Sequence, residues 1–251
     1  MMDTKVLVIT GGGRGIGAAI ARHAAAGNYA IAVNYLRDST SAEAVVREIN
    51  DAGGKSIAVG GDVSKAKDVE ALFDEAAERL GTITHVVNNA GITGRSGRLE
   101  VTDEATIRAC IDINVTGSIL VAREACRRMS LRHAGKGGVI INMSSGAATL
   151  GSHHEYVWYA ASKGAIDSLT IGLSKELADD GIRVNAVAPG LIETDIHQHS
   201  AGDPGRMERI RPTIPLKRIG TPDEVAEAVM FLLSDAASYI TGSILRVAGG
   251  R

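Results

Sequence analysis

Short apolar runs rich in β-branched residues alternate along the chain with longer amphipathic segments. Seven runs have strand length: 5–10 (KVLVIT), 29–35 (YAIAVNY), 56–61 (SIAVGG), 85–90 (HVVNNA), 138–145 (GVIINMSS), 182–189 (IRVNAVAP) and 243–249 (SILRVAG). Between them, 41–52, 65–80 and 103–133 have helical periodicity. Near-continuous apolar strands separated by helices are typical of a parallel sheet covered on both faces. The pattern predicts an α/β fold: a doubly wound parallel sheet of about seven strands with helices on both faces.

The predicted elements leave no linker, repeat or low-complexity tract in the 251 residues, so we expect a single domain over 1–251. The prolines fall in one window near the end of the chain. Everything before that window can form uninterrupted strands and helices, whereas 193–220 is irregular and rich in Gly, Pro, His and Arg. Long irregular segments inside compact domains are usually lids or binding loops, which predicts a substrate lid at about 193–220. The prolines are Pro189, Pro204, Pro212, Pro215 and Pro222.

Composition excludes several classes of function. A net charge of −2 provides no basic field for nucleic acid, and 45% hydrophobic residues suit a globular domain with a sizeable core. Cys110 and Cys126 are too few for a disulfide framework, and we expect both to act as small hydrophobic residues within helices. The first apolar run is far too short for a signal sequence or a membrane span. We therefore expect a cytoplasmic protein with no nucleic-acid or membrane partner.

The segment VLVITGGGRGIGAAIARHAAAG combines a strand, a glycine-rich turn and an alanine-rich helix that begins near Arg14. Gly11, Gly15 and Gly17 would let the backbone turn sharply, approach a pyrophosphate and pack the helix closely on the sheet. The helix N-terminus would offer N–H groups and a partial positive charge to the phosphates. Because the turn follows a strand and opens a helix, it predicts a dinucleotide-binding site.

The end of the second predicted strand bears on the choice between NAD and NADP. A carboxylate about 20 residues beyond the glycine turn would bind the ribose 2′-hydroxyl of NAD, whereas an arginine would bind the 2′-phosphate of NADP. Neutral Asn34 stands at the carboxylate position, Arg37 lies just beyond it, and Arg14 lies within the glycine turn. Two guanidinium groups, with no opposing carboxylate until Asp38, favour a phosphate dianion. NADP(H) is therefore predicted over NAD(H).

Tyr159 and Lys163 stand four residues apart in YVWYAASKGA, so a helix would place them on one face. A free phenol titrates near 10, and a lysine ammonium within about 4–6 Å would lower that pKa. Such a tyrosine can deliver a proton to the alkoxide that forms when a carbonyl is reduced. Tyr156 has Ala160 at the corresponding position. Tyr159 is therefore the predicted acid/base, and a serine of the preceding NMSS segment could polarise the substrate oxygen.

Together these motifs resemble those of the short-chain dehydrogenase/reductase family, which has the Rossmann fold, over the whole chain and in order. The resemblance rests on Thr10-Gly11-x-x-x-Gly15-x-Gly17, Asp62-Val63, NNAG at 88–91, NMSS followed by Tyr-x-x-x-Lys, and VAPGLIETD. It is similar in particular to sugar-dehydrogenase-like and 3-oxoacyl-carrier-protein-reductase-like members, through the YAASKGAID helix. The resemblance implies an NAD(P)(H)-dependent enzyme that interconverts CH–OH and C=O groups, and a homotetramer packed through the fourth and fifth helices.

The resemblance also implies residue roles. The catalytic set would be Asn114, Ser145, Tyr159 and Lys163, with Ser144 the alternative to Ser145, and Asn114 would hold a water linked to Lys163. The Asp-Val pair would contact the adenine, the Asn-Ala-Gly turn the ribose, and the Pro-Gly turn the nicotinamide carboxamide. The implied cofactor contacts are Thr10, Gly11, Arg14, Gly15, Ile16, Gly17, Asn34, Arg37, Asp62, Val63, Asn89, Ala90, Gly91, Tyr159, Lys163, Pro189, Gly190, Ile192 and Thr194.

The chain departs from the family pattern at two places. The gap from Ser145 to Tyr159 is about one residue longer than usual, which indicates an insertion in GSHHEYVW that reshapes the pocket wall. Ala248 stands where an aspartate is more usual, which would affect packing or subunit contacts more than chemistry. We expect the lengthened segment, not the tyrosine, to decide what is reduced.

Several other side chains could suggest a metal or docking site, but we assign none of them to a predicted site. His153, His154, His197 and His199 have metal-ligand spacings, but no cysteine joins them, and no metal is predicted. Trp158 is expected to fill the pocket or a subunit interface. A cationic run near the end of the long helix could dock an acidic carrier protein, although the helix dipole favours cations there in any case. That run is Arg123, Arg127, Arg128, Arg132 and Lys136.

The sequence thus predicts an NADP(H)-dependent oxidoreductase acting between a small-molecule carbonyl and its secondary alcohol. A sugar or polyol and a β-ketoacyl thioester are both open as substrates. The alternative function is a non-catalytic NADP(H)-binding redox sensor. The intact catalytic set argues against a sensor, because a sensor could keep the glycine turn and lose Tyr159 or Lys163.

Overall fold

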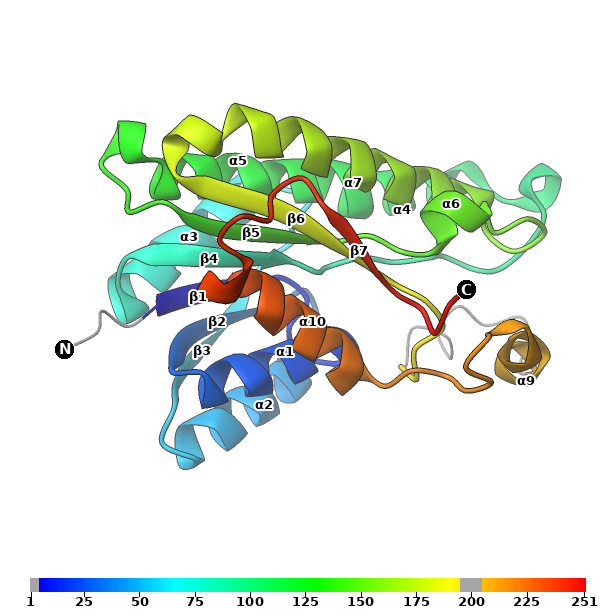
Figure 1. Cartoon of the computed structure of the whole chain (residues 1–251), viewed down its shortest axis with the longest axis horizontal. Helices are drawn as coiled ribbons and strands as arrows, with labels where there is room; N and C mark the ends of the chain where they lie inside the picture. Colours follow the sequence, from blue (N-terminus) through cyan, green and yellow to red (C-terminus); the bar gives the residue numbers. More distant parts are fainter. Residues whose placement is uncertain (1–4, 195–204) are drawn as a thin grey trace.

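A seven-stranded parallel sheet forms the centre of the computed structural model, which describes residues 5–194 and 205–251 (Figure 1). Its strands are β1 (Lys5–Ile9), β2 (Tyr29–Tyr35), β3 (Lys55–Gly60), β4 (Ile83–Asn88), β5 (Gly138–Met143), β6 (Ile182–Pro189) and β7 (Ile244–Val247). Their order is β3-β2-β1-β4-β5-β6-β7, and each pair of neighbours is parallel. The predicted sheet is confirmed, because each strand falls on one of the seven apolar runs.

Helices cover both faces of this sheet (Figure 1). On one face lie α1 (Gly15–Ala26), α2 (Ser39–Asp51) and α10 (Pro222–Leu233). On the other lie α3 (Ala66–Leu80), α4 (Glu104–Ile111), α5 (Ser118–Met129) and α7 (Val157–Glu176). Two short helices, α6 (Ala147–Leu150) and α9 (Arg206–Ile210), lie near the carboxyl ends of the strands. The predicted doubly wound architecture is therefore confirmed.

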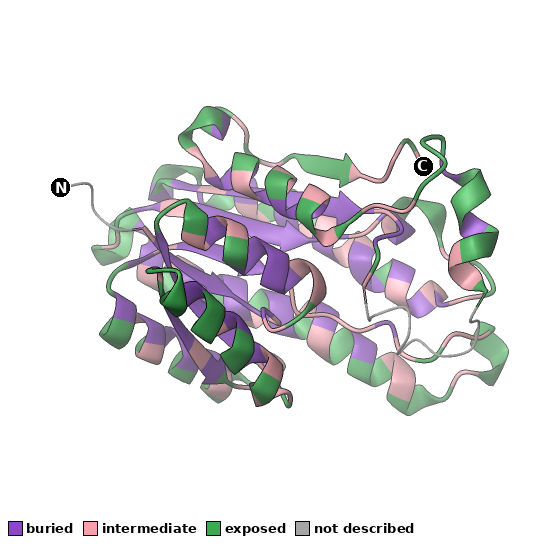
Figure 2. Ribbon diagram, turned by 90° about the horizontal axis from the view of Figure 1, so that it is seen from below, coloured by how far each residue is buried: buried purple, intermediate pink, exposed green. Residues whose placement is uncertain are grey.

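The apolar runs are near-continuous because the central strands are buried on both faces. Successive side chains of a strand point to opposite faces. Leu7 and Ile9 accordingly pack in the core beneath α1, α2 and α10, whereas Val6 and Val8 pack beneath α3 and α5. Figure 2 shows the central strands buried and the outer faces of the helices exposed. A strand that buries both faces needs no polar alternation, which explains the pattern in the sequence.

The predicted helix over 103–133 is present but interrupted. α4 leads into a π-helical segment, Asp112–Gly117, which continues as α5 and ends at Met129. A π segment within an α-helix is rare and frequently marks a functional site. By length and composition alone, Glu104–Met129 also resembles a membrane-crossing helix. Its contacts with α3, β4 and α7 show that it packs as a helix of the α/β domain.

The strand order reverses between β1 and β4, and ligands of doubly wound sheets bind in the crevice at this switch point. The carboxyl ends of the strands meet along one edge, and the polar motifs follow β1, β4, β5 and β6 there. Within the predicted lid at 193–220, residues 195–204 lie outside the described residues. The remainder is anchored by a bridge between Ile192 and Gly220 and contains α9. The lid and the single-domain boundaries stay predictions.

Candidate active site

The turn after β1 has the backbone geometry of a phosphate-binding turn. Gly11 and Gly15 have φ of +61° and +51°, a region that favours glycine. A Cβ on Gly17 would stand 2.5 Å from the Gly11 oxygen and 2.6 Å from Asn89 Nδ2, so only glycine fits. α1 begins at Gly15, and no side chain of the described residues caps it. Its first N–H groups can therefore bind an anion, as the sequence predicted.

Thr10 and Asn89 hold this turn against the end of β4. Thr10 Oγ1 accepts hydrogen bonds from the Asn89 and Ala90 amides at 2.9 and 3.0 Å. Asn89 Nδ2 donates to the Thr10 and Gly11 oxygens at 2.9 and 3.0 Å. The two motifs after β1 and β4 therefore form one connected floor of the crevice. Because the Thr10 and Asn89 side chains are bonded within the protein, they hold the two turns together at the base of the crevice.

Asn34, which stands where a carboxylate would favour NAD, is bonded within the protein, and its predicted cofactor contact stays a prediction. Its side chain is buried, and Nδ2 donates to the Val59 and Gly61 oxygens at 3.3 and 3.1 Å. Its Oδ1 accepts a hydrogen bond of 3.4 Å from the Gly11 amide. These bonds commit Asn34 to the interior, where it supports the glycine turn from behind. The sequence interpretation missed this because it weighed the charge of Asn34 and not the face of β2 on which it lies.

The two arginines predicted to bind a 2′-phosphate follow β1 and β2 and are both exposed. Arg14 forms an ion pair with Asp38, with 3.6 Å between Nε and Oδ2. Asp38 accepts hydrogen bonds from the Ser41 hydroxyl and amide, and these hold the pKa of Asp38 below its usual value. Arg37 makes no hydrogen bond or ion pair with other residues of the two described ranges. Asp38 therefore offsets part of the charge of Arg14 and leaves Arg37 the less engaged cation.

Asp62 and Val63 follow β3, where the adenine contact is expected. The Asp62 carboxylate accepts hydrogen bonds from the Ser64 amide and hydroxyl at 3.0 and 2.7 Å. Burial pushes the pKa of Asp62 up, but the bonds from Ser64 outweigh it and hold the pKa below its usual value. Val63 is buried, and a Cβ on Gly117 would stand 2.9 Å from its Cγ2. The adenine contact itself stays a prediction.

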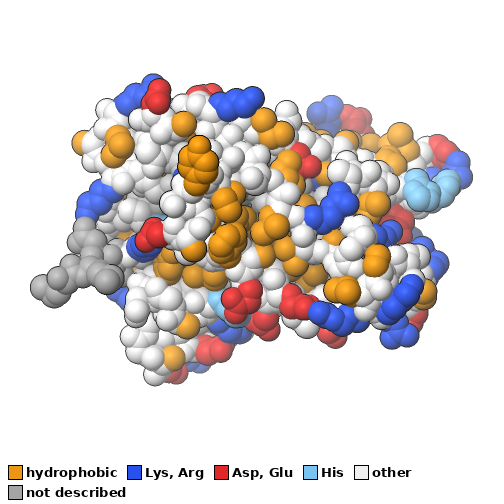
Figure 3. Space-filling model, in the orientation of Figure 1, with side chains coloured by type: hydrophobic (Ala, Val, Ile, Leu, Met, Phe, Trp, Pro, Cys, Tyr) orange, Lys and Arg blue, Asp and Glu red, His pale blue; other side chains and the backbone are white. Residues whose placement is uncertain are grey.

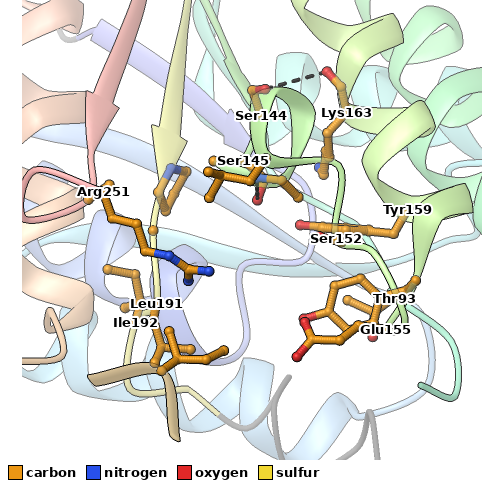
Figure 4. Close-up of a pocket in the computed structure, with 18 of the residues that line it drawn as sticks. Thr93, Ser144, Ser145, Ser152, Glu155, Tyr159, Lys163, Leu191, Ile192 and Arg251 are labelled. Carbon is orange, nitrogen blue, oxygen red and sulfur yellow. Dashed lines mark hydrogen bonds between the residues drawn. The ribbon is translucent and has the colours of Figure 1, made fainter. Parts of the chain in front are cut away.

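Tyr159 and Lys163 lie on α7, and Ser145 follows β5 on the facing side of the same cavity (Figure 4). Lys163 Nζ lies 5.7 Å from the centroid of the Tyr159 ring. It donates a 2.7 Å hydrogen bond to the Met143 oxygen at the end of β5. Ser145 also interacts with the Tyr159 phenol through its side chain. Three of the four predicted catalytic residues therefore line one cavity.

The electrostatics of this group differ from the expected effect of lysine on tyrosine. Burial raises the pKa of Tyr159 to about 12, although its hydrogen bond with Ser145 lowers it in part. Burial also lowers the pKa of the Lys163 ammonium to about 8. Desolvation dominates the pKa of the phenol, and the expected lowering of that pKa by Lys163 stays a prediction. Tyr159 is a neutral phenol at pH 7, which is the form that can donate a proton.

Tyr156 occupies a different environment from Tyr159. It is buried, precedes α7, and packs edge-to-face on Tyr159 with 5.5 Å between ring centroids. The Arg206 guanidinium lies 5.3 Å from the centroid of the Tyr156 ring. Burial raises the pKa of Tyr156 strongly, so it too is neutral. Its ring packs on Tyr159, and no lysine among the described residues lies over it as Lys163 lies over Tyr159.

Ser144 and Ser145 engage different groups. Ser144 is buried, and its Oγ donates a 2.5 Å hydrogen bond to Asp167 Oδ1 on α7. It also lies 3.5 Å from the Lys163 main-chain oxygen, the bond drawn in Figure 4. Ser145 is the serine that interacts with Tyr159, which favours it over Ser144. Sequence reasoning missed Asp167, although a carboxylate four residues after Lys163 was the available signal.

Asn114 lies in the π segment and is fully buried. Its Oδ1 accepts a 2.8 Å hydrogen bond from the Ile92 amide, and its Nδ2 donates to the Ile92 oxygen at 2.9 Å. Nδ2 also donates to Ser162 Oγ at 3.0 Å. A Cβ on Gly91 would stand 3.3 Å from Asn114 Oδ1 and 3.5 Å from Lys163 Nζ. The structure thus brings Asn114 close to Lys163. The Asn114 side chain itself holds the loop after β4 through its bonds to Ile92. The water that Asn114 is expected to hold stays a prediction.

The turn after β6 forms the opposite wall of the crevice. The Pro189 oxygen accepts a 2.8 Å hydrogen bond from the Gly146 amide, which joins this turn to the end of β5. Ile192 is buried, and a Cβ on Gly15 would stand 3.3 Å from Thr194 Cγ2. The segment after β6 therefore reaches the glycine turn after β1. The residues predicted to contact the nicotinamide therefore line the same cavity as Ser145 and Tyr159.

A cavity of about 490 Å³ joins these parts. Its wall beyond the catalytic group is the segment 151–156 and α9, which an ion pair connects. Arg206 Nε and Nη2 donate to Glu155 Oε1 and Oε2 at 3.1 and 2.9 Å, and Arg209 Nη2 donates to Oε1 at 3.3 Å. The lengthened segment and the predicted lid therefore bind each other. His153 and His154 also line this wall, as expected for pocket residues.

Comparisons with known proteins match this arrangement. A family model described as enoyl-(acyl carrier protein) reductase matches residues 11–251. The chain belongs to the short-chain dehydrogenase/reductase family. The uncharacterized oxidoreductase YgfF of Escherichia coli is 46% identical over 98% of this chain and 99% of its own length. The 3β-hydroxysteroid dehydrogenase 1 of Eggerthella lenta is 42% identical over 98% of this chain and 93% of its own. This short-chain protein is accordingly an oxidoreductase.

Solved structures of the family superimpose closely on this member. A 3-ketoacyl-(acyl-carrier-protein) reductase from Brucella melitensis, complexed with NADH, has a TM-score of 0.90 and 36% identity, covering 98% of both chains. A short-chain dehydrogenase from Burkholderia cenocepacia, in complex with NADP, has a TM-score of 0.90 and 33% identity, covering 98% of this chain and 97% of its own. These likenesses support a nicotinamide cofactor, as predicted, without separating NAD from NADP.

Several of the remaining suggestive side chains of this family member have partners within the protein. Trp158 is buried, and its Nε1 donates a 2.8 Å hydrogen bond to the Thr93 oxygen beneath the site. Cys110 is buried and Cys126 half-buried, and burial raises the pKa of both thiols. In the cationic run, Arg128 pairs with Glu124 and Asp74, Arg127 with Glu124, and Arg132 with Asp180. His197 and His199 lie outside the described residues, and the absence of a metal stays a prediction.

Proposed function

We propose that the protein is an NADP(H)-dependent reductase that converts a small-molecule ketone or aldehyde to its alcohol, and catalyses the reverse oxidation. One observation carries the proposal. Ser145 and Tyr159 line one cavity beside Lys163, next to the glycine turn and the turn after β6. A carbonyl oxygen held there would meet a hydroxyl that polarises it and a neutral phenol that protonates it.

The geometry supports a different role for each of the proposed catalytic residues. Ser145 would hydrogen-bond the substrate oxygen, and Tyr159 would donate its phenolic proton as negative charge develops there. The buried Lys163 ammonium would stabilise the resulting phenolate, at a cost that shows as its lowered pKa of about 8. Asn114 would keep the loop after β4 in place through its bonds to Ile92. A bound nicotinamide would supply or accept the hydride.

The residues present fit such a cofactor. The glycine turn leaves no room for a side chain at Gly17, and the N-terminus of α1 offers N–H groups for the pyrophosphate. Arg37 and Arg14 would contact the 2′-phosphate of NADP, with Arg37 contributing more because Asp38 already pairs with Arg14. Thr10 and Asn89 would keep the turns after β1 and β4 in place beneath the cofactor. Asn34 would act indirectly through Gly11.

The proposed substrate is a small carbonyl compound. A β-ketoacyl thioester on a carrier protein is the less favoured option, because most of the cationic run already pairs with carboxylates on the same chain. The predicted lid would close the cavity through α9, whose Arg206 pairs with Glu155. We also propose that the protein is a homotetramer and is cytoplasmic. Exposed apolar Ile111 and Ile119 on the 104–129 helix support packing through the fourth and fifth helices.

A second apolar surface supports oligomer formation. Phe231 of α10 and Ile244 and Leu245 of β7 are exposed. Figure 3 shows hydrophobic side chains gathered over these two elements. β7 is the edge strand of the sheet, and an exposed apolar edge is commonly covered by another chain. Light scattering coupled to size-exclusion chromatography would distinguish a tetramer from a dimer or monomer.

The test is turnover across a panel of ketones, aldehydes and sugars, with NADPH and NADH compared as reductants by kcat/KM. The proposal expects reduction of at least one panel member and a preference for NADPH. A preference for NADH of about tenfold or more would overturn the cofactor assignment. Tight NADPH binding without turnover of any carbonyl, in either direction, would instead support the redox-sensor alternative.

A further inference from the structure

The chain after β7 is shaped to bring Arg251 into the active-site cavity. Gly249 and Gly250 have φ of +62° and +91°, and the Arg251 amide donates a 3.2 Å hydrogen bond to the Ala248 oxygen. A Cβ on Gly249 would stand 2.8 Å from Ile214 Cγ2. The Gly249 oxygen accepts a 3.1 Å hydrogen bond from the Leu216 amide. This tight turn therefore packs on the end of the predicted lid, and its glycines set the direction of Arg251.

The Arg251 side chain points into the cavity from the wall opposite Tyr159 (Figure 4). Its guanidinium has no hydrogen bond or ion pair with the residues that the structure describes, although Arg251 is only half exposed. Arg246 fixes its backbone from behind, because Arg246 Nη1 donates to the Arg251 oxygen at 3.4 Å and Nη2 bonds Thr149 on α6. The side chain is thus placed by a supported turn and ends in a group with five donors to satisfy.

Among the described residues that line the cavity, cationic side chains outnumber carboxylates. Its described lining contains four cationic side chains, Lys163, Arg206, Arg209 and Arg251, and one carboxylate, Glu155. That carboxylate already accepts hydrogen bonds from Arg206 and Arg209, and no hydrogen bond or ion pair joins it to Arg251 within the described residues. A cation partly withdrawn from water without a counter-charge is unfavourable, and a cavity of one sign attracts ligands of the other.

We propose that the substrate carries an oxyanion group, a carboxylate or a phosphate, which Arg251 binds while the carbonyl lies at Ser145 and Tyr159. This inference rests on the proposed function and names its substrate class. A guanidinium fork matches the two oxygens of such a group, and a neutral sugar would leave Arg251 uncompensated. Because Arg251 and Tyr159 face each other across the cavity, the anionic group belongs at the end of the molecule remote from the carbonyl.

The experiment compares matched triplets of ketones: an oxo carboxylate, its methyl ester, and a phosphate monoester of the corresponding hydroxyketone, each over several chain lengths. We expect kcat/KM for one anionic member to exceed that of its neutral ester by about tenfold or more. In Arg251→Gln this anion-to-ester ratio should fall about tenfold, and in Arg251→Lys by less, because lysine keeps the charge but loses the fork. The control is Arg79→Gln, the same change at a surface arginine of α3 that pairs with Glu75.

Calorimetric titration of wild type and Arg251→Gln with a non-reducible dicarboxylate provides a second readout. Weaker binding to Arg251→Gln would support the inference even without turnover, and the proposed function alone would then fail. Reduction of esters and acids with equal kcat/KM would overturn the inference and leave the proposed function intact. An anion-to-ester ratio unchanged in Arg251→Gln would overturn it as well. The carboxylate and phosphate arms identify which oxyanion is bound.

Discussion

Ser144 Oγ donates a 2.5 Å hydrogen bond to Asp167 Oδ1, one turn of α7 beyond Lys163. The bond joins the end of β5 to α7, the helix that carries Tyr159 and Lys163. Lys163 Nζ joins the same two elements through its hydrogen bond to the Met143 oxygen. The charge of Asp167 raises the pKa of Lys163, against the larger lowering effect of burial. We infer that Asp167 positions α7 against β5 and favours the charged form of Lys163.

Asp167→Asn should shift the pH dependence of activity. Without this carboxylate the pKa of Lys163 falls below about 8, so the alkaline limb of kcat/KM should move to lower pH. The measurement is kcat/KM against pH from about 6 to 10. Ser144→Ala is the matched control, because it removes the hydrogen bond and keeps the charge. An equal shift in both variants would show that the bond and not the charge is responsible.

Tyr159→Phe should lower kcat by about 10²-fold or more and leave NADPH affinity near wild type, because it removes the proton donor and keeps the ring. Tyr156→Phe is the internal control. It retains the edge-to-face contact with Tyr159 and the contact with Arg206, so its kcat should stay within a few-fold of wild type. Steady-state kinetics and fluorescence titration with NADPH measure the two effects. Comparable losses in both variants would contradict the assignment of Tyr159.

Arg37→Gln should reduce the preference for NADPH. Because Arg14 already pairs with Asp38, Arg37 is expected to supply most of the charge at the 2′-phosphate. The ratio of kcat/KM for NADPH to that for NADH should fall about tenfold, the effect of losing a charge-assisted bond. Arg47→Gln, an exposed arginine of α2, is the control and should keep the wild-type ratio. An unchanged ratio in Arg37→Gln would remove Arg37 from the site.

Lys163→Met should abolish activity and yet preserve or increase stability at pH 7. The folded-state pKa of Lys163 is lowered from 10.5 to about 8, so its charged form opposes folding by up to about 3 kcal/mol below pH 8. That penalty disappears as the pH rises from about 8 towards 10.5, so the wild type should gain stability relative to the variant in this window. Urea unfolding at pH 7 and 10 measures the difference.

The control for this prediction is Lys175→Met, the same substitution at an exposed position of α7. It removes a lysine of the same helix from the surface and leaves the buried Lys163 in place, so it controls for the loss of a lysine as such. A Lys163→Met protein that is clearly less stable than wild type at pH 7 would mean that the bond to the Met143 oxygen outweighs the desolvation of the charge.

The sequence predicts the fold well because burial on both sides of a parallel sheet leaves a simple pattern of apolar runs. It also predicts the partnership of Tyr159 and Lys163, since a spacing of four residues determines a shared helix face. Asn34 shows the limit of such reasoning: the face of β2 on which it lies, and not its lack of charge, determines that it bonds to Gly61 and Gly11. Burial, which raises the pKa of Tyr159, depends on packing that no local pattern encodes.

Contacts between distant segments are the other part that the sequence does not predict. Arg206 and Glu155 are 51 residues apart and pair across the cavity, and Arg251 reaches the site from the other end of the chain. The π segment that contains Asn114 likewise follows from tertiary packing, because no residue type from 112 to 117 identifies it. Only the glycine pair before Arg251 was a local signal, since two glycines together favour a turn.

Glu155→Gln should loosen α9 from the wall of the cavity. Glu155 and Arg206 have side-chain exposures of only 16% and 13%, and the bidentate bonds from Arg206 hold the pKa of Glu155 below its usual value although burial pushes it up. A lowered carboxyl pKa adds stability above the unfolded value of about 4.5 and loses it as the pH falls through the folded pKa. The variant should therefore melt below wild type at pH 7, by several degrees for a loss of about 2 kcal/mol, and the gap should narrow as the pH falls below 4.5. KM for the substrate should rise more than kcat falls, since Arg209 and Ile210 of α9 line the cavity.

The control for Glu155→Gln is Glu208→Gln, the same change at an exposed carboxylate of α9. It should leave both the melting temperature and KM near wild type. Equal effects of the two substitutions would show that helix charge, and not the bond to Arg206, controls this wall.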